Sequence, residues 1–336
     1  MSKKLLLAVL ALTAFSVFSQ TPQPSPQISP SPSPTPVSLE TILAEAEKQT
    51  VRYKENFSNL LAEEIKTFET HNKNGEVKET RRVESNFLVY QSAKNPERIV
   101  EYRNVTKVDG KPVGNSEKRA EDFFNDVLRS DSAEKELEKI QRESTRYDKN
   151  LDIRGLTLYQ APILAEHIRR ALNFTIVNEE SYNDREVYVI NYLQKSPSPY
   201  IIFNDDNTKP EKLRLRYQVD LPKSLRDVQP LLRGTLWIDK ETFQVFQERR
   251  DLVLPINSQS KPVALWEMTF EYQISELGVL TPKKITLTDN NIKVRDKGAD
   301  YSLVTDNKAT FEYTKFTRSD VEVKSGEVDP SKIQNN

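Results

Sequence analysis

Residues 234–251 read GTLWIDKETFQVFQERRD, in which two β-rich runs flank the sequence Asp-Lys-Glu-Thr, typical of a tight turn. This stretch predicts a β-hairpin. In the run that follows, polar residues from Glu267 to Gln273 alternate with hydrophobic ones, so one face of the strand is apolar. The hydrophobic positions are Ala264, Trp266, Met268, Phe270, Tyr272 and Ile274. We therefore expect an antiparallel sheet with one large apolar face.

Strand-like segments extend on both sides of this hairpin. They cover residues 59–70, 76–92, 98–108, 174–179, 186–194, 213–219, 280–289, 301–305 and 309–316. Helices are expected at 39–57, with Ser38 as N-cap, once or twice between 116 and 146, and briefly at 162–172. The order of these elements predicts an α+β, mainly β fold.

The two ends of the chain are expected to lie outside the folded part. Residues 1–19 resemble a signal peptide, because Lys3 and Lys4 precede an uncharged apolar run that ends before Gln20. That run is shorter than the about 20 residues of a permanent membrane helix, so we expect no stable span after cleavage. Residues 20–37 form a Pro/Ser-rich tether and 329–336 a disordered tail. Export to the periplasm of a Gram-negative-type bacterium follows, with secretion as the alternative.

The composition argues against several classes of function. The formal net charge is only -1, so no nucleic-acid partner is implied. Without cysteine, disulfides, thiol catalysis and lipid attachment after the signal are excluded, and two histidines make a zinc site improbable. The chain contains neither GxGxxG nor GxxxxGK followed by Ser or Thr, the two glycine-rich motifs that bind the phosphates of nucleotides. Adjacent acids such as Asp205 and Asp206 are expected by chance among 50 acidic residues. We therefore expect no catalytic residue, metal or cofactor.

Four features of the chain carry a resemblance to a known family: the opening segment ILAEAEKQTVRYKENF (42–57), the meander after it, the hairpin 234–251 and the export signal. Together they resemble the LolA/LolB-like family of envelope proteins. That family includes periplasmic lipoprotein carriers and the sensor domain of the sigma-factor regulator RseB. The resemblance implies a strongly curved antiparallel half-barrel, closed by helices, whose concavity accepts acyl chains. It places one such domain at 38–328, with a helical insertion at about 116–172 that lengthens the chain.

Two hypotheses of function follow from this resemblance. In the first, the protein is a non-enzymatic carrier whose apolar concavity binds a lipid, an acyl chain or a lipoprotein. Its expected lining residues are Trp237, Phe243, Phe246, Trp266, Met268, Phe270 and Tyr272. The same residues could instead form an ordinary sheet core. In the second hypothesis, an envelope protein partner binds to a sheet edge or to the helical insertion. The location of exposed apolar surface distinguishes the two.

Overall fold

The computed structural model describes residues 37–318, apart from 59, 93, 96, 152, 205–211, 259–260 and 296–299. The expected signal peptide, most of the tether and the tail lie outside the described residues. None of the helices in the described part is long and apolar enough to cross a membrane.

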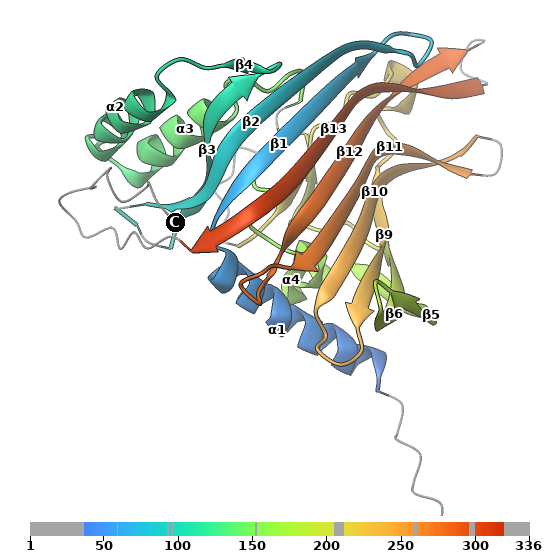
Figure 1. Cartoon of the computed structure of the whole chain (residues 1–336). Coiled ribbons are helices and arrows are strands. Elements are labelled where there is room, and N and C mark those ends of the chain that lie inside the picture. The colour runs from blue at the N-terminus through green and yellow to red at the C-terminus, as the bar shows by residue number, and fades with distance from the viewer. Residues whose placement is uncertain are drawn as a thin grey trace, which may run out of the picture. The chain divides into compact units, whose positions relative to one another are not determined.

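An antiparallel sheet of 11 strands dominates the structure, in the order β4-β3-β2-β1-β13-β12-β11-β10-β9-β6-β5 (Figure 1). Its strands are β1 (Leu60–His71), β2 (Val77–Gln91), β3 (Ile99–Val108), β4 (Lys111–Pro112), β5 (Leu172–Tyr182), β6 (Arg185–Gln194), β9 (Leu231–Asp239), β10 (Val245–Ser258), β11 (Lys261–Ile274), β12 (Leu280–Arg295) and β13 (Asp300–Arg318). β7 (Ile201–Phe203) and β8 (Leu215–Tyr217) form a separate parallel pair. Figure 1 shows that the sheet is curved and does not close into a barrel.

The helices are α1 (Leu39–Phe57), α2 (Ser116–Leu128), α3 (Ala133–Ser144) and α4 (Glu166–Arg169), with 3-10 turns η1 (Pro162–Leu164) and η2 (Lys223–Leu225). α1 begins after Ser38, whose hydroxyl accepts the Thr41 N–H at 3.2 Å. It buries Ile42, Ala46 and Phe57 against the sheet.

The two faces of the sheet carry different covers. We call the face that packs against α1 the inner face. The described residues of two connections also cover it: the 145–171 connection, between α3 and β5, without residue 152, and the 195–230 connection, between β6 and β9, without residues 205–211. α2 and α3 instead pack on the opposite, outer face, where Tyr102 and Val100 of β3 meet Val127 and Ile140 in a second core. The expected insertion at 116–172 is therefore divided: α2 and α3 extend the outer side of the sheet, and residues 145–171 help to cover the inner side.

The predicted fold class is confirmed: the protein is mainly β, with a curved antiparallel sheet and few helices. α1 and the hairpin formed by β9 and β10 lie where the sequence predicts them. Three details differ. Residues 301–305 and 309–316 belong to one strand, β13, and the short helix near 162 is a 3-10 turn followed by one α-helical turn. The alternating run 213–219 supplies β8, which lies outside the main sheet.

Candidate ligand-binding face

Four of the seven predicted lining residues lie together on the inner face of β11. Strand pairing places Phe270 beside Glu248 and Ile285, and Trp266 beside Leu252 and Asp289. Met268, Phe270 and Tyr272 are at most 5% exposed and belong to the core under α1. Trp266 is half-buried and lies nearer the end of the sheet that α1 does not reach. Of this group, Trp266 is the residue that solvent and a ligand can reach.

Of the other three residues, Phe246 belongs to the same main core and Phe243 packs against it, whereas Trp237 does not join it. Trp237 lies on the outer face, because its strand neighbours Leu236 and Ile238 take the inner positions. Its indole N–H donates to the Glu180 carboxylate at 2.8 Å. Phe243 lies in the turn after β9 with a positive φ of 58°.

Phe246 is buried at the point where β10 loses register with β9. The Arg185 guanidinium stacks 4.6 Å from its ring centroid. The Phe246 ring is therefore covered by the protein, and a ligand at the surface would have to displace the Arg185 guanidinium to contact that face of the ring.

Buried charges on the inner face were not foreseen from the sequence. We call the first group the Arg103 cluster: Glu64, Lys66, Glu101, Arg103 and Asp148. Arg103 donates to both oxygens of Glu64, at 2.6 and 2.9 Å, and to Glu101 at 2.9 Å. Lys66 donates to Asp148 at 2.5 Å, and both side chains are at most 5% exposed. The cluster thus holds the 145–171 connection against β1 and β3.

Burial governs the protonation of these groups. It lowers the pKa of Lys66, and the neighbouring charge of Arg103 lowers it further. Burial also raises the pKa of Asp148, against the opposing effect of Lys66. Burial also tends to raise the pKa of Glu64. The pKa of Glu64 is nevertheless lower than its ordinary value, because the charges of Arg103 and Lys66 and the hydrogen bonds from Arg103 stabilise the ionised carboxylate. The Glu64–Arg103 contact is therefore an ion pair at neutral pH.

A second group, the Arg250 cluster, comprises Glu248, Arg250 and Tyr192. Arg250 donates to both Glu248 oxygens, at 2.7 and 2.8 Å, and Tyr192 donates to Glu248 at 3.0 Å. The Arg250 guanidinium lies 4.8 Å from the Phe270 ring centroid. The deep part of the inner face is therefore filled by core side chains and paired charges, and the predicted apolar lining there serves as core.

The 195–230 connection lies over the remaining, more open end of the inner face. The carbonyl of Gln218, just after β8, accepts the indole N–H of Trp266 at 3.2 Å. Within β8 itself, the side chains of Leu215 and Tyr217 are buried in the main core. Arg216 points away from it and is exposed. The connection therefore contacts the edge of the Trp266 ring and leaves part of that ring accessible.

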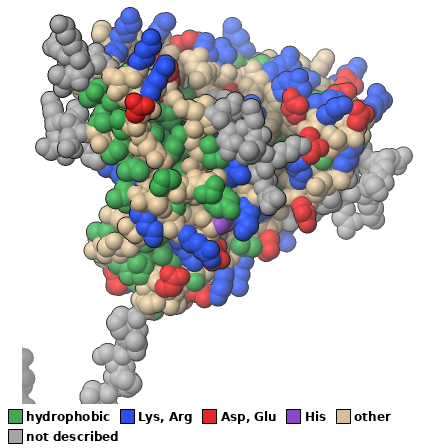
Figure 2. Space-filling view, turned by 180° about the vertical axis from the view of Figure 1, so that it is seen from behind, with side chains coloured by type: hydrophobic (Ala, Val, Ile, Leu, Met, Phe, Trp, Pro, Cys, Tyr) green, Lys and Arg blue, Asp and Glu red, His purple; other side chains and the backbone are tan. Residues whose placement is uncertain are grey.

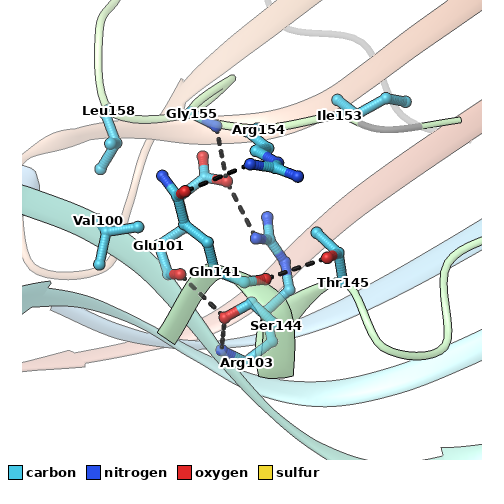
Figure 3. Close-up of a pocket in the computed structure, with 10 residues that line it drawn as sticks. All are labelled: Val100, Glu101, Arg103, Gln141, Ser144, Thr145, Ile153, Arg154, Gly155 and Leu158. Carbon is cyan, nitrogen blue, oxygen red and sulfur yellow. Dashed lines mark hydrogen bonds and ion pairs between the residues drawn. The ribbon is translucent and has the colours of Figure 1, made fainter. Parts of the chain in front are cut away.

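Two small cavities lie near these elements. The first, of about 180 Å³, lies beside the Arg103 cluster between β3, the end of α3 and the 145–171 connection (Figure 3). Its polar walls are already paired: Glu101 accepts hydrogen bonds from Gly155 N–H at 3.1 Å and Thr157 N–H at 2.8 Å.

The second cavity, of about 210 Å³, lies between α1 and the turn around Gly278. Both volumes fall below the roughly 300–1,000 Å³ of typical ligand pockets. Among the described residues, no group of three or more His, Asp or Glu is arranged to hold a metal ion.

Comparison with known proteins finds similar structures but no family model or curated protein that matches the chain. A DUF1329 family protein from Desulfovibrio piger is 12% identical, with 88% of this chain and 99% of that chain covered and a TM-score of 0.31. A LolA superfamily protein from Nitrosomonas europaea is 11% identical, with 86% and 97% covered and a TM-score of 0.32. The lipoprotein LppX of Mycobacterium tuberculosis is 10% identical, with 85% and 100% covered and a TM-score of 0.24. The LolA superfamily named by the sequence resemblance is thus among the structures found, and at these scores the likeness says nothing about function.

Proposed function

We propose that this protein is an exported, non-enzymatic binding protein that holds an amphipathic, acyl-bearing ligand against Trp266 at the open end of the inner face. The accessible indole of Trp266 is the observation that carries this proposal. An acyl chain, free or on a lipid or lipoprotein, gains free energy by covering such a surface, about 0.8 kcal/mol for each methylene removed from water.

Strand pairing gives Trp266 one apolar neighbour, Leu252, and one acidic neighbour, Asp289. Half-buried hydrophobic residues that pack against the same core come from the 195–230 connection and from β10 and β13: Leu213, Val219, Leu221, Ile256 and Tyr301. Figure 2 shows hydrophobic side chains gathered over part of the face seen from behind, with Lys and Arg side chains around them. An apolar surface with a charged rim suits a ligand that has an acyl chain and a polar head.

The buried charges limit how deeply a ligand can enter. An acyl chain that reached the Arg103 or Arg250 cluster would leave charged groups without their partners, which costs several kcal/mol for each ion. We therefore expect the chain to lie along the Trp266 end of the sheet. If about ten methylenes are covered, the gross gain is roughly 8 kcal/mol, and because association itself costs several kcal/mol we expect a Kd well above about 1 μM.

Tryptophan fluorescence tests this proposal, because the chain has only two tryptophans. In a Trp237→Phe background, titration with a lysophospholipid below its micelle concentration should shift the Trp266 emission to the blue in a saturable manner. Binding of a radiolabelled lysophospholipid should be lost in Trp266→Glu and kept in Trp237→Phe, with both variants folded by circular dichroism. A folded Trp266→Glu that binds as tightly as the wild type would contradict the proposed site.

A further inference from the structure

β5 is one of the two end strands of the sheet, and no strand of the described chain pairs with its outer edge. β5 is 11 residues long. At the opposite end of the sheet, β3 is covered along its edge. The Ser144 hydroxyl accepts the Arg103 N–H and donates to the Glu101 carbonyl, and Arg119 donates to the Val105 carbonyl. The β5 edge is thus the one long set of backbone donors and acceptors that is open to another strand.

The residues along this edge favour strand pairing. Residues 173–178 read NFTIVN, with no charge, proline or glycine. Ile176 is 37% exposed, Val177 55%, and Leu193 on the neighbouring β6 48%. These three make up a third of the nine exposed large hydrophobic residues in the described chain, gathered on two adjacent strands. Ile176 and Val177 lie on the edge strand itself, where exposed hydrophobic residues favour an interaction surface, whereas Leu193 lies one strand in, beside Asn173 and on the opposite face from Ile176.

The acidic residues of β5 do not protect its edge, because they face neighbouring strands. Glu179 forms an ion pair with Lys240, and Glu180 accepts the indole N–H of Trp237. Both partners belong to β9 or the turn after it, on the side of β5 away from its free edge. The irregularity between Ile176 and Asn178 leaves Val177 without a partner on β6 and exposed.

The charges that flank β5 indicate what pairs with it. Arg169 and Arg170 precede the strand. Arg169 is largely buried and pairs with Glu40 and Glu47. Arg170 is exposed, and among the described residues it pairs only with the exposed Glu166 beside it. Glu179, Glu180 and Asp184 lie in the second half of the strand and the turn beyond. An antiparallel pair of β5 strands, related by a two-fold axis near the middle of 173–178, sets the basic flank of each copy against the acidic half of the other. A parallel pair would set like charges together. The strand is therefore complementary to itself in one orientation.

We propose that two copies of this protein associate through their β5 strands, antiparallel, to form one continuous sheet across a two-fold axis. The neutral stretch 173–178 lies at the centre of the interface. Ile176 and Val177 supply its apolar contacts, and Arg170 and Asp184 contribute attraction at its ends. This interface lies apart from the Trp266 surface and does not depend on the proposed ligand.

Sedimentation velocity of the chain from residue 20 onward, over a wide range of concentration, tests this proposal. The wild type should shift from the mass of one chain towards that of two, and Val177→Lys should remain a single chain. Val51→Lys is the matched control, because Val51 is also 55% exposed but lies on α1, and it should behave as the wild type. Circular dichroism should show that all three are folded.

Charge reversal tests the orientation of the pair. Arg170→Glu should weaken association, and Arg170→Glu combined with Asp184→Arg should restore it. A wild type that stays a single chain at every concentration would overturn the proposal, and so would a dimer that Val177→Lys leaves intact.

Discussion

Glu64 and Arg103 form a bidentate ion pair in which both side chains are at most 3% exposed. Because the pKa of Glu64 is lower in the folded protein than its ordinary value of 4.5, its ionisation contributes stability above that pH and loses it as pH falls through the folded pKa. Glu64→Gln should therefore lower the free energy of unfolding at pH 7 by about 3–5 kcal/mol, the cost of leaving a buried charge unpaired. Urea unfolding measures this difference.

The pH dependence separates the ion pair from a packing effect. The difference between the wild type and Glu64→Gln should shrink as pH falls below 4.5, because protonation removes the same charge from the wild type. Glu63→Gln is the control, since Glu63 is exposed on the outer face and pairs with Lys315 there. A Glu64→Gln effect that is equally large at low and neutral pH would argue against the ion pair.

Gly234 in β9 lies where a side chain has no room. A Cβ built on it would lie 2.0 Å from the Arg249 carbonyl oxygen and 2.3 Å from the Tyr192 hydroxyl, which belongs to the Arg250 cluster. Gly234→Ala should force these groups apart and destabilise the protein by about 1–3 kcal/mol. Gly114→Ala meets nothing within 4 Å and should leave the melting temperature unchanged. Equal melting temperatures for the two variants would contradict this account.

Among the elements, α1 depends on its N-terminal cap. The Ser38 hydroxyl accepts the Thr41 N–H, which otherwise has no partner within the helix. Ser38→Ala should cost about 1 kcal/mol, measured by urea unfolding. Ser58→Ala is a suitable control, because the Ser58 hydroxyl donates to the Glu55 carbonyl at the other end of α1 and serves no N-terminal N–H. If Ser38→Ala proved as stable as the wild type, the cap would have no energetic role.

The elements could be predicted well where one face of a segment is uniformly apolar. Alternation predicted β11 and, from Trp266 to Tyr272, its inner face, and helical spacing predicted α1. At the two ends of the run, Ile274 is exposed and a register shift separates Ala264 from Trp266. The same alternation in 213–219 showed which side chains are buried but not which strand they pair with, so the parallel contact with β7 was not foreseen. Side-chain period alone does not specify a partner strand.

The candidate site was harder to predict than the elements. Trp237 follows Leu236 directly, and adjacent strand residues point to opposite faces, so one of them had to leave the inner surface. The charge clusters join residues that are distant in sequence, such as Glu64 and Arg103. One signal was visible in the sequence. Ala62, Glu64, Lys66 and Phe68 are spaced two residues apart on β1, so the two charged side chains lie on the same inward-facing side as the hydrophobic ones.

At the scale of the whole molecule, the curved sheet encloses a core whose deep part is closed by α1, two connections and paired charges. Two separate parts of the accessible hydrophobic surface of the described residues carry the two proposals: the half-buried ring of Trp266, and Ile176 and Val177 on the β5 edge. The first suits an acyl-bearing ligand and the second another strand. Because the two surfaces share no residue, ligand binding and self-association should be separable by substitution.

Native mass spectrometry of the protein purified from a cell envelope, before and after organic extraction, tests the central claim most directly. The account predicts a bound mass of an acyl-bearing compound that extraction removes, and a Trp266→Glu variant that is purified the same way without it. A wild type that carries no such mass, or a folded Trp266→Glu that carries as much of it, would contradict the claim that Trp266 marks the ligand site.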